Sequence, residues 1–203
     1  MPPSLFSSDP HRQATALIAG LRYLPAFLHP EEARSLLQDI DAAPWLDDLK
    51  RRVQHYGYKY DYRRRSIDYS MRLGELPEWA TPLAERFVAE GIMPWRPDQL
   101  IVNEYQPGQG IANHVDCEPC FDDTIVSMSM GSGCVMNFTR LADRKEIIPL
   151  RLLPRSVVVL AGPARYEWMH GIKGVKNDKW EGHRIPRLRR VSLTFRKTIL
   201  ASA

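Results

Sequence analysis

A histidine and an aspartate one residue apart are the first residues of this chain whose types and spacing suggest chemistry. They are His114 and Asp116, at the end of the segment 100–116. Successive side chains of a β-strand point to opposite faces, so these two would project from the same side. Imidazole nitrogens and carboxylate oxygens are both metal ligands. The pair predicts part of a metal site, and the alternative is a polar strand end beside a turn.

A third ligand from another strand would complete such a site. His170 is our first candidate because it ends a predicted strand that follows the apolar run 157–160, and His183 in the next loop is the alternative. Two histidines and one carboxylate form the ligand set of non-heme Fe(II) oxygenases. The sequence therefore predicts an Fe(II) site at His114, Asp116 and His170.

The last predicted strand carries two arginines on one face. Its polar residues alternate with apolar ones and so share one side of the strand: Arg190, Ser192, Thr194 and Arg196. Arginines that point into a barrel need anions, and a dicarboxylate such as 2-oxoglutarate supplies them through charge-assisted hydrogen bonds. Asn103 and Tyr105 share a face of an earlier strand and would bind the same co-substrate as amide and phenol donors.

The segment 50–72 interleaves tyrosines with arginines and has no helical apolar stripe. If it is extended, four rings at every second position share one face: Tyr56, Tyr58, Tyr60 and Tyr62. Such a face stacks on nucleobases while nearby arginines, among them Arg51, Arg52 and Arg63, neutralise phosphates. The alternative is a hairpin whose rings cover the core. We expect some rings to pack in the core and others to reach a substrate.

Two helices and a short strand precede the strands of the site. A helix is predicted from Pro30 to about Ala42, because proline and two acids suit a first turn. A second helix is predicted from about Pro77 to Glu90, with Trp79, Leu83, Phe87 and Val88 on its buried face. Residues 21–24 are predicted to form a strand, and residues 1–19 a weakly structured lead-in.

From residue 99 onward the pattern is one of short strands separated by turns. The predicted strands are 99–105, 112–116, 124–130, 133–139, 145–150, 156–161, 166–170 and 189–198. Residues 178–186 are predicted to be a loop before the last strand. Short strands at this spacing favour a sandwich or jelly roll.

Length and composition indicate a single globular domain over residues 1–203. No apolar run of membrane-spanning length and no signal-peptide pattern is present, so we expect a cytoplasmic protein that does not bind membranes. We also expect a monomer. The net charge is +4 and the pI is near 9.0. The basic residues cluster at 51–65 and 184–197, which indicates either a polyanionic partner or a solvated surface.

The chain has three cysteines, at Cys117, Cys120 and Cys134. Cys117 and Cys120 form a C-x-x-C pattern, but no second pair follows to complete a zinc site. We therefore expect reduced thiols rather than a redox or zinc centre.

Taken together, these residues resemble the AlkB family of Fe(II)/2-oxoglutarate dioxygenases. The resemblance rests on NEYQPG at 103–108, His114-x-Asp116, His170-Gly171 and Arg190-x5-Arg196, in that order, and it covers roughly residues 50–198. Locally, RRVQHYGYKYDYR, NEYQPGQGI and IVSMSMGSGCVMNF most resemble the AlkB domain of the animal tRNA wobble-uridine hydroxylase.

The resemblance implies an α+β fold with a double-stranded β-helix (jelly roll) core at 97–198. It also implies an N-terminal extension at 1–96, with helices packed on the core and a nucleotide-recognition lid at about 50–72. His114, Asp116 and His170 would hold iron. By the same resemblance, the co-substrate would lie against the cofactor-binding set Asn103, Tyr105, Arg190, Ser192 and Arg196, with Arg190 and Tyr105 at its distal carboxylate and Asn103 and Arg196 near its keto-acid end.

Glu118 bears on the choice of substrate. In repair members of the family, an acidic residue two positions after the metal-binding aspartate contacts the target base, and Glu118 stands there. The resemblance thus implies oxidative dealkylation of alkylated bases in DNA or RNA, with Fe(II), 2-oxoglutarate and O2. The alternatives are hydroxylation of a modified tRNA wobble uridine and a non-catalytic nucleic-acid-binding module. The alternative for Glu118 itself is a solvent-exposed acidic residue of a turn, without contact to a base.

Overall fold

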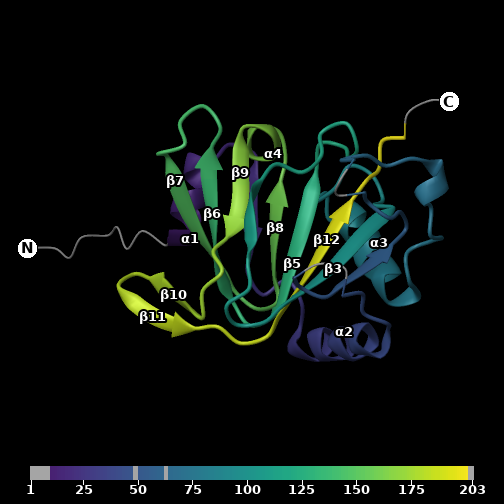
Figure 1. Cartoon of the computed structure of the whole chain (residues 1–203), viewed down its shortest axis with the longest axis horizontal. Helices are drawn as coiled ribbons and strands as arrows, with labels where there is room; N and C mark the ends of the chain where they lie inside the picture. Colours follow the sequence, from purple (N-terminus) through teal and green to yellow (C-terminus); the bar gives the residue numbers. More distant parts are fainter. Residues whose placement is uncertain (1–9, 48–49, 62–63, 201–203) are drawn as a thin grey trace, which may run out of the picture.

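The computed structural model describes residues 10–47, 50–61 and 64–200, and its strands form two antiparallel sheets and a separate hairpin (Figure 1). The strands are β1 (Leu21–Leu24), β2 (Val53–Tyr56), β3 (Gln99–Tyr105), β4 (Ile111–His114), β5 (Ile125–Gly131), β6 (Cys134–Arg140), β7 (Ile147–Leu152), β8 (Ser156–Leu160), β9 (Trp168–Ile172), β10 (Asn177–Trp180), β11 (His183–Pro186) and β12 (Arg190–Arg196). The six-stranded major sheet has the order β1-β8-β5-β12-β3-β2, and the four-stranded minor sheet has the order β4-β9-β6-β7. This is the predicted jelly roll.

The helices lie mainly at the N-terminal end of the chain. They are α1 (Pro10–Leu17), α2 (Pro30–Ala42), α3 (Thr81–Ala89) and α4 (Pro163–Tyr166), with short 3₁₀ turns at Tyr69–Met71 and Glu78–Ala80. Helix α2 has the predicted bounds. Its first turn is capped by the Glu32 carboxylate, which accepts a hydrogen bond from the His29 backbone N–H at 3.3 Å. None of the described helices is long and apolar enough to cross a membrane.

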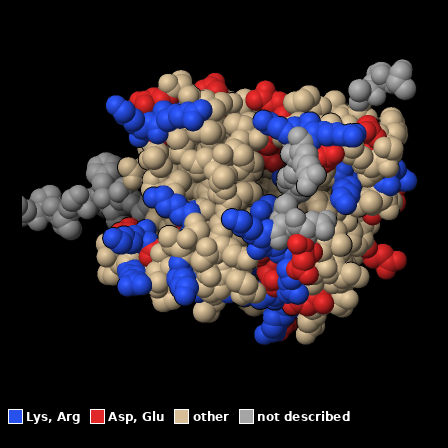
Figure 2. All heavy atoms as spheres, in the orientation of Figure 1, with Lys and Arg blue, Asp and Glu red and all other residues tan. Residues whose placement is uncertain are grey.

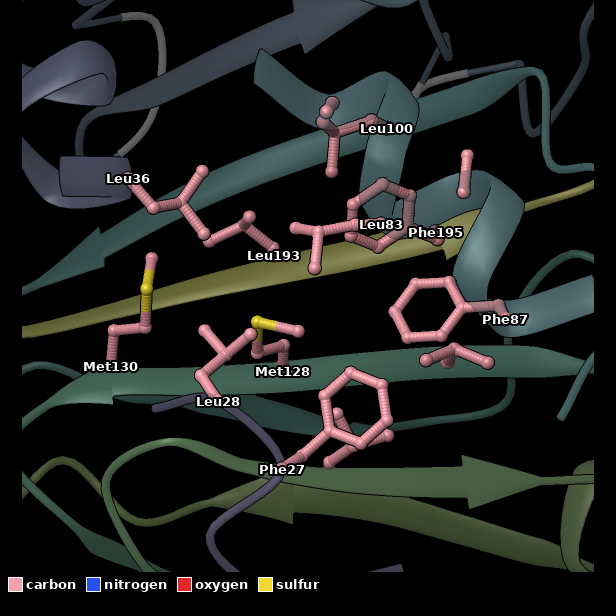
Figure 3. Close-up of a cluster of buried hydrophobic side chains, with 14 of the residues drawn as sticks. Phe27, Leu28, Leu36, Leu83, Phe87, Leu100, Met128, Met130, Leu193 and Phe195 are labelled. Carbon is pink, nitrogen blue, oxygen red and sulfur yellow. The ribbon is translucent and has the colours of Figure 1, made fainter. Parts of the chain in front are cut away.

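Both faces of the major sheet are covered, and they differ in chemistry. One face carries apolar residues such as Leu100 and Leu193, which pack against α2 and α3 through Leu36 and Phe87 (Figure 3). The opposite face of β3 and β12 points between the two sheets and carries the polar residues of the predicted site. The helices therefore anchor the sheet and leave its inner face available for chemistry.

Two N-terminal expectations need correction. Residues 10–17 form helix α1, where a weakly structured lead-in was predicted, because Ala14 and Ile18 anchor this segment in the core between the sheets. The second predicted helix begins as a 3₁₀ turn and becomes α-helical only at Thr81. Its predicted buried residue Val88 is 39% exposed, and Ala84 is buried instead.

The predicted loop at 178–186 is a β-hairpin formed by β10 and β11. Its inward residues Asp178 and Trp180 are buried. The hairpin forms without a continuous apolar pattern because Asp178 accepts hydrogen bonds from Arg187 within the protein, at 2.6 Å for each of two contacts. A buried ion pair of this kind leaves little trace in hydrophobic periodicity.

The tyrosine segment does not form one extended aromatic face. Strand β2 ends at Tyr56, and Gly57 follows with a backbone φ of +75°, which residues other than glycine rarely adopt. The turn sends Tyr56 to the helix-covered core and Tyr58 to the core between the sheets. Tyr62 lies outside the described residues.

Candidate metal centre and co-substrate pocket

A cavity of about 800 Å³ opens between the two sheets and is lined by most of the polar residues that the sequence singled out. The inner faces of β3 and β12 form one wall, and residues 110–117 with the end of β9 form another. Segment 50–65 contributes Lys50, Arg51, Tyr60 and Arg65 to the lining. The predicted metal ligands and co-substrate residues therefore share one cavity.

Strand pairing brings the two histidines of the predicted metal site together. His114 ends β4 and is the direct cross-strand partner of His170 on β9, and the two ring centroids are 4.4 Å apart. Asp116 lies two residues beyond the strand end, and its Oδ2 is 3.5 Å from Nε2 of His170. One ligand atom from each of the three residues lies within 4.8 Å of the others. His183 is exposed on β11 and is not part of this group.

The donor set fits a metal ion on two further observations. Asp116 Oδ1 accepts from Arg196, but Oδ2 is buried without a hydrogen-bond partner, which a bound cation would supply. Nδ1 of His114 lies 2.9 Å from the Ala112 carbonyl. A carbonyl can only accept, so Nδ1 carries the proton and Nε2 is left to bind the metal.

Burial and nearby charges keep two residues of the triad, Asp116 and His170, in metal-binding protonation states. Burial raises the pKa of Asp116, but the nearby positive charge of Arg196, with smaller contributions from the histidines, outweighs it and leaves that pKa well below its ordinary value. Burial, reinforced by the neighbouring His114, lowers the pKa of His170 to about 3. At neutral pH the site thus offers an ionised carboxylate and a neutral imidazole.

The two arginines of β12 have different surroundings. Arg196 donates to Asp116 Oδ1 from Nε at 2.8 Å and to Gln99 Oε1 from Nη1 at 3.1 Å, so its guanidinium is largely engaged by the protein. Arg190 donates from Nη2 to Ser129 Oγ at 2.8 Å, and its buried Nε has no partner. The open donor of Arg190 suits a carboxylate ligand in the cavity.

The other co-substrate residues surround Arg190 through the register of β3 and β12. Tyr105 is the direct cross-strand partner of Arg190, and the guanidinium lies 5.4 Å from the centre of the tyrosine ring. Asn103 pairs with Ser192 two residues along the strands, and its Oδ1 accepts from Arg51 Nε at 2.8 Å. All of these residues line the cavity. Arg51, which was expected to bind substrate, therefore contacts the cavity wall formed by β3 and β12.

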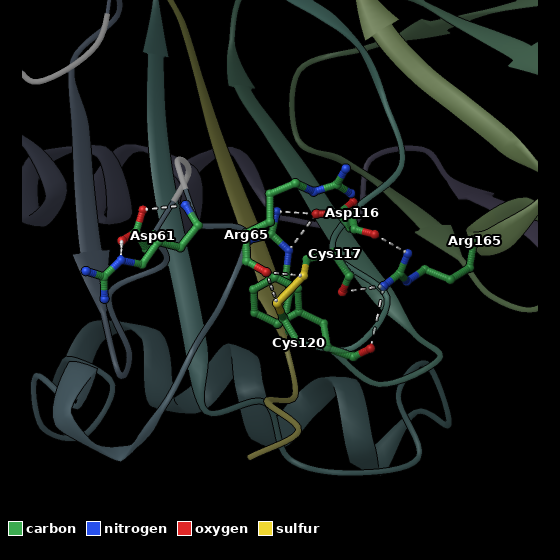
Figure 4. The surroundings of a disulfide bond; sticks show 9 residues. Asp61, Arg65, Asp116, Cys117, Cys120 and Arg165 are labelled. Carbon is green, nitrogen blue, oxygen red and sulfur yellow. Dashed lines mark hydrogen bonds and ion pairs between the residues drawn. A yellow bond between two sulfur atoms is a disulfide. The ribbon is translucent and has the colours of Figure 1, made fainter. Parts of the chain in front are cut away.

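Sequence reasoning missed Arg165, which holds the loop after Asp116 (Figure 4). This α4 residue is 2% exposed, and its guanidinium donates to the backbone carbonyls of Asp116 at 2.9 Å and Cys117 at 3.1 Å. A contact to Phe121 O is longer, at 3.5 Å. No motif pointed to this residue, because its partners are backbone atoms that any sequence would provide.

The prediction of reduced cysteines is wrong for two of the three. Cys117 and Cys120 form a disulfide, because the turn between them brings their Cα atoms to 5.3 Å. Both sulfur atoms lie against the Arg65 carbonyl, at 3.2 and 3.4 Å (Figure 4). Cys134 is buried and unpaired. The disulfide therefore closes the turn 117–120, which directly follows Asp116 and lies beside Arg65 of the cavity lining.

Several residues expected to bind substrate are engaged elsewhere. Tyr56 packs edge-on against Trp79, and Tyr58 is buried in the core between the sheets. Arg52 donates to Glu104 on the opposite face of β3. Glu118 is exposed and is not among the residues that line the cavity. The predicted contact Arg63 lies outside the described residues.

Comparison with known proteins identifies the family. Residues 46–196 match the profile of the 2OG-Fe(II) oxygenase superfamily. The chain belongs to this superfamily. It is 40% identical over 202 residues to "Alkylated DNA repair protein ALKBH8 homolog" of Arabidopsis thaliana, across 89% of this chain and 58% of that protein. It is 37% identical over 168 residues to "tRNA (carboxymethyluridine(34)-5-O)-methyltransferase alkbh8" of Xenopus tropicalis, across 80% of this chain and 26% of that protein.

A solved structure agrees with this assignment at the level of the fold. The structure of OsALKBH1 matches with a TM-score of 0.65 and 18% sequence identity, over 88% of this chain and 96% of that chain. The expected AlkB resemblance, jelly-roll fold and dioxygenase class are thereby confirmed. As a member of this superfamily, the enzyme uses Fe(II), 2-oxoglutarate and O2, and its histidine–aspartate–histidine group fits the iron. The chain spans less than two thirds of the length of either curated relative.

Proposed function

We propose that this oxygenase hydroxylates a carbon substituent on a modified base of DNA or RNA. The observation that carries the proposal is the composition of the cavity beside the metal triad. Lys50, Arg51 and Arg65 bring positive charge to its lining, and Tyr60 adds an aromatic ring. Cations suit the phosphates of a nucleotide, and an aromatic ring suits its base.

The residues of the chain divide the work between them. His114, Asp116 and His170 would hold the iron, which, when bound, uses O2 and 2-oxoglutarate to supply the oxidising power for C–H hydroxylation. Arg190, with its unpartnered Nε, orients a carboxylate of the co-substrate, and the Tyr105 phenol lies beside it. The sheets on either side limit the access of bulk water to the reacting groups.

A nucleobase enters such a cavity only outside the base stack. An enzyme that acts on a base either takes single-stranded substrate or rotates the target nucleotide out of the duplex, at a cost of a few kcal/mol. The cavity volume of about 800 Å³ leaves space for a base together with the co-substrate. We therefore expect unpaired target bases to be preferred.

Oxidative dealkylation is the first candidate reaction. Hydroxylation of an N-alkyl carbon gives a hemiaminal, which releases an aldehyde and leaves the unmodified base. The name of the Arabidopsis relative, an alkylated DNA repair protein, supports this reading. Glu118 adds no support to it, since its side chain is exposed and away from the cavity lining.

Hydroxylation of a uridine side chain in tRNA is the second candidate. It is favoured by the Xenopus relative, which is named for a carboxymethyluridine at tRNA position 34. Here the hydroxylated carbon is bonded to carbon, so the product keeps its hydroxyl group and no aldehyde leaves. The two candidates thus differ in a product that mass spectrometry detects directly.

A substrate panel tests the proposal. The enzyme, Fe(II) and 2-oxoglutarate are incubated with N-methylated single-stranded DNA and RNA, and with a tRNA anticodon stem–loop that carries a carboxymethyl group on its wobble uridine. A loss of about 14 Da with formaldehyde release indicates dealkylation, and a gain of about 16 Da indicates side-chain hydroxylation. His170→Ala protein is the control. Absence of either mass change on every substrate would overturn the proposal.

A further inference from the structure

We propose that the β10–β11 hairpin and the turn before it bind the phosphate backbone of the nucleic acid whose base enters the cavity. The inference rests on the proposed function and assigns a partner to a surface outside the cavity. We call the surface the hairpin track, and it consists of four exposed residues: Lys173, Lys176, Lys179 and Arg184. Figure 2 shows Lys and Arg side chains gathered over this hairpin, at the lower left of the view.

The charges of the hairpin track are not neutralised by the protein. In the described part of the chain, none of the four side chains forms an ion pair, and the exposed Glu181 at the hairpin tip pairs with none of them. Surface arginines elsewhere are paired, as in Arg34–Glu31 at 3.5 Å and Arg86–Glu90 at 2.7 Å. The track therefore offers cations that are available to an external anion.

The hairpin places two of its cations directly opposite each other. Lys179 on β10 and Arg184 on β11 are cross-strand partners, so their side chains leave the same face of the two-stranded ribbon. The other face is the one that packs on the protein, through the buried Asp178 and Trp180. Like charges in directly opposed positions destabilise a strand pair. A phosphate between them would remove that repulsion.

A buried ion pair closes the base of the hairpin and is hydrogen-bonded to the body of the enzyme. Arg187 donates to both oxygens of Asp178 at 2.6 Å, and Asp178 Oδ2 also accepts from the Val135 backbone N–H at 3.2 Å. Nη1 of Arg187 donates to the Lys173 carbonyl at 2.7 Å, which holds the preceding turn as well. The cations of the track are thus carried on an anchored element.

Two further hydrogen bonds connect the turn before the hairpin to the residues beside the cavity. The Gly108 N–H donates to the Val175 carbonyl at 3.2 Å, and Nε2 of Gln109 donates to the Lys50 carbonyl at 2.6 Å. Lys50 lines the cavity. A neighbouring groove of about 430 Å³ reaches Lys173 and shares residues 110–113 with the cavity wall. A nucleic-acid strand whose base occupies the cavity can therefore follow this groove toward the hairpin.

Salt-dependent binding measures the proposed contacts without knowledge of the modified base. Each phosphate contact to a single strand adds about 0.7 to the slope of log affinity against log salt concentration. In the triple variant Lys176→Ala/Lys179→Ala/Arg184→Ala, we expect the slope to fall by about 2 and the affinity at low salt to fall at least about tenfold. The assay is fluorescence anisotropy on the full chain, loaded with Fe(II) without O2, with short single-stranded RNA and DNA of one sequence.

The matched control removes the same net charge elsewhere. Arg22→Ala/Arg34→Ala/Arg96→Ala changes three exposed arginines outside the track, and we expect it to keep the wild-type slope. Equal losses of salt slope and affinity in both triple variants, or an unchanged salt slope in the hairpin variant, would overturn the proposal that the track binds phosphates. Thermal unfolding confirms that both variants fold. If the enzyme oxidises a modified substrate but the hairpin variant keeps the wild-type salt slope, only the track is contradicted. If the slope falls as expected but no substrate is oxidised, the proposed function is contradicted instead.

Discussion

At the scale of single residues, the two arginines of β12 show how neighbours assign different tasks to the same side chain. Arg196 and Arg190 lie on the same face of one strand and line the same cavity. Asp116 and Gln99 occupy the donors of Arg196, whereas Arg190 keeps a buried Nε without a partner. We therefore propose that Arg196 positions the predicted metal ligand Asp116 and that Arg190 anchors an anionic co-substrate.

Arg190→Ala should weaken 2-oxoglutarate binding while the fold is retained. Loss of a hydrogen-bonded charge pair costs about 1.5–3 kcal/mol, which corresponds to roughly 10- to 150-fold in the dissociation constant. The measurement is 2-oxoglutarate titration of the metal-loaded protein by calorimetry. Arg96→Ala is the control, because it removes the same charge from an exposed arginine that does not line the cavity. An unchanged dissociation constant in Arg190→Ala would place the co-substrate elsewhere.

His114→Ala should remove the metal without disturbing the core. His114 is only partly buried at the end of β4, so the substitution leaves no large internal cavity. We expect Fe(II) to bind at least about tenfold more weakly and succinate formation to be lost. Metal titration and a succinate assay are the two measurements. His183→Ala changes an exposed histidine outside the triad and should retain both metal binding and succinate formation. Retained metal binding in His114→Ala would refute the assignment of the triad.

At the scale of elements, predictability follows from how each element is stabilised. Strands such as β3 and β12 alternate faces that differ in polarity, so their positions and the polar residues that face the cavity could be predicted from the sequence. The β10–β11 hairpin depends on a buried Asp178–Arg187 pair, which carries no periodic signal. The prediction of one extended aromatic face in segment 50–61 failed because the positive φ of Gly57 redirects the chain after Tyr56. The candidate metal ligands could be recognised in the sequence by their residue types. Arg165 could not, because it contacts backbone carbonyls.

Arg165→Met should weaken metal binding by loosening the loop that follows Asp116. The substitution keeps an apolar stem but leaves the Asp116 and Cys117 carbonyls without their buried donor. Loss of a residue that supports a metal ligand commonly lowers metal affinity by about 10- to 100-fold. Metal titration is the readout, with thermal unfolding measured in parallel.

Arg165→Lys provides the comparison for this role. One ammonium group can reach some of the same carbonyls, so metal affinity should lie between those of the wild type and Arg165→Met. A stability loss in Arg165→Met with wild-type metal affinity would show that Arg165 supports the fold but not the metal ligand.

At the scale of the whole molecule, one buried carboxylate joins parts of the chain that are far apart in sequence. Glu104 projects from β3 on the face opposite the cavity and is 3% exposed. Its oxygens accept from Arg52 Nε at 2.6 Å and from Arg189 Nε at 2.6 Å, and Arg189 also binds Asp41 of α2. The segment before β2, the strand β3, the start of β12 and helix α2 thus meet at a single charge.

This connection makes stability depend on acid pH. Hydrogen bonding by Arg52, with a further contribution from Arg189, outweighs burial and lowers the pKa of Glu104 from 4.5 to about 2. The unfolded chain takes up the proton near pH 4.5, but the folded chain resists it until about pH 2. The stabilisation is therefore complete above pH 4.5 and is lost as the pH falls toward 2. It amounts to about 2–3 kcal/mol, since both arginines are partly exposed and screened.

Glu104→Gln should flatten this part of the acid limb. The amide keeps the shape of the side chain but does not titrate, so the free energy of unfolding should fall less steeply from pH 5 to pH 2 than it does in the wild type. At neutral pH the variant should be less stable by about 2 kcal/mol, because Arg52 loses its charged partner. Urea unfolding at a series of pH values measures both effects. Glu85→Gln changes an exposed carboxylate of α3 and should follow the wild-type curve. If the curves of Glu104→Gln and the wild type run parallel through the acid range, Glu104 is not the group that links these elements to pH.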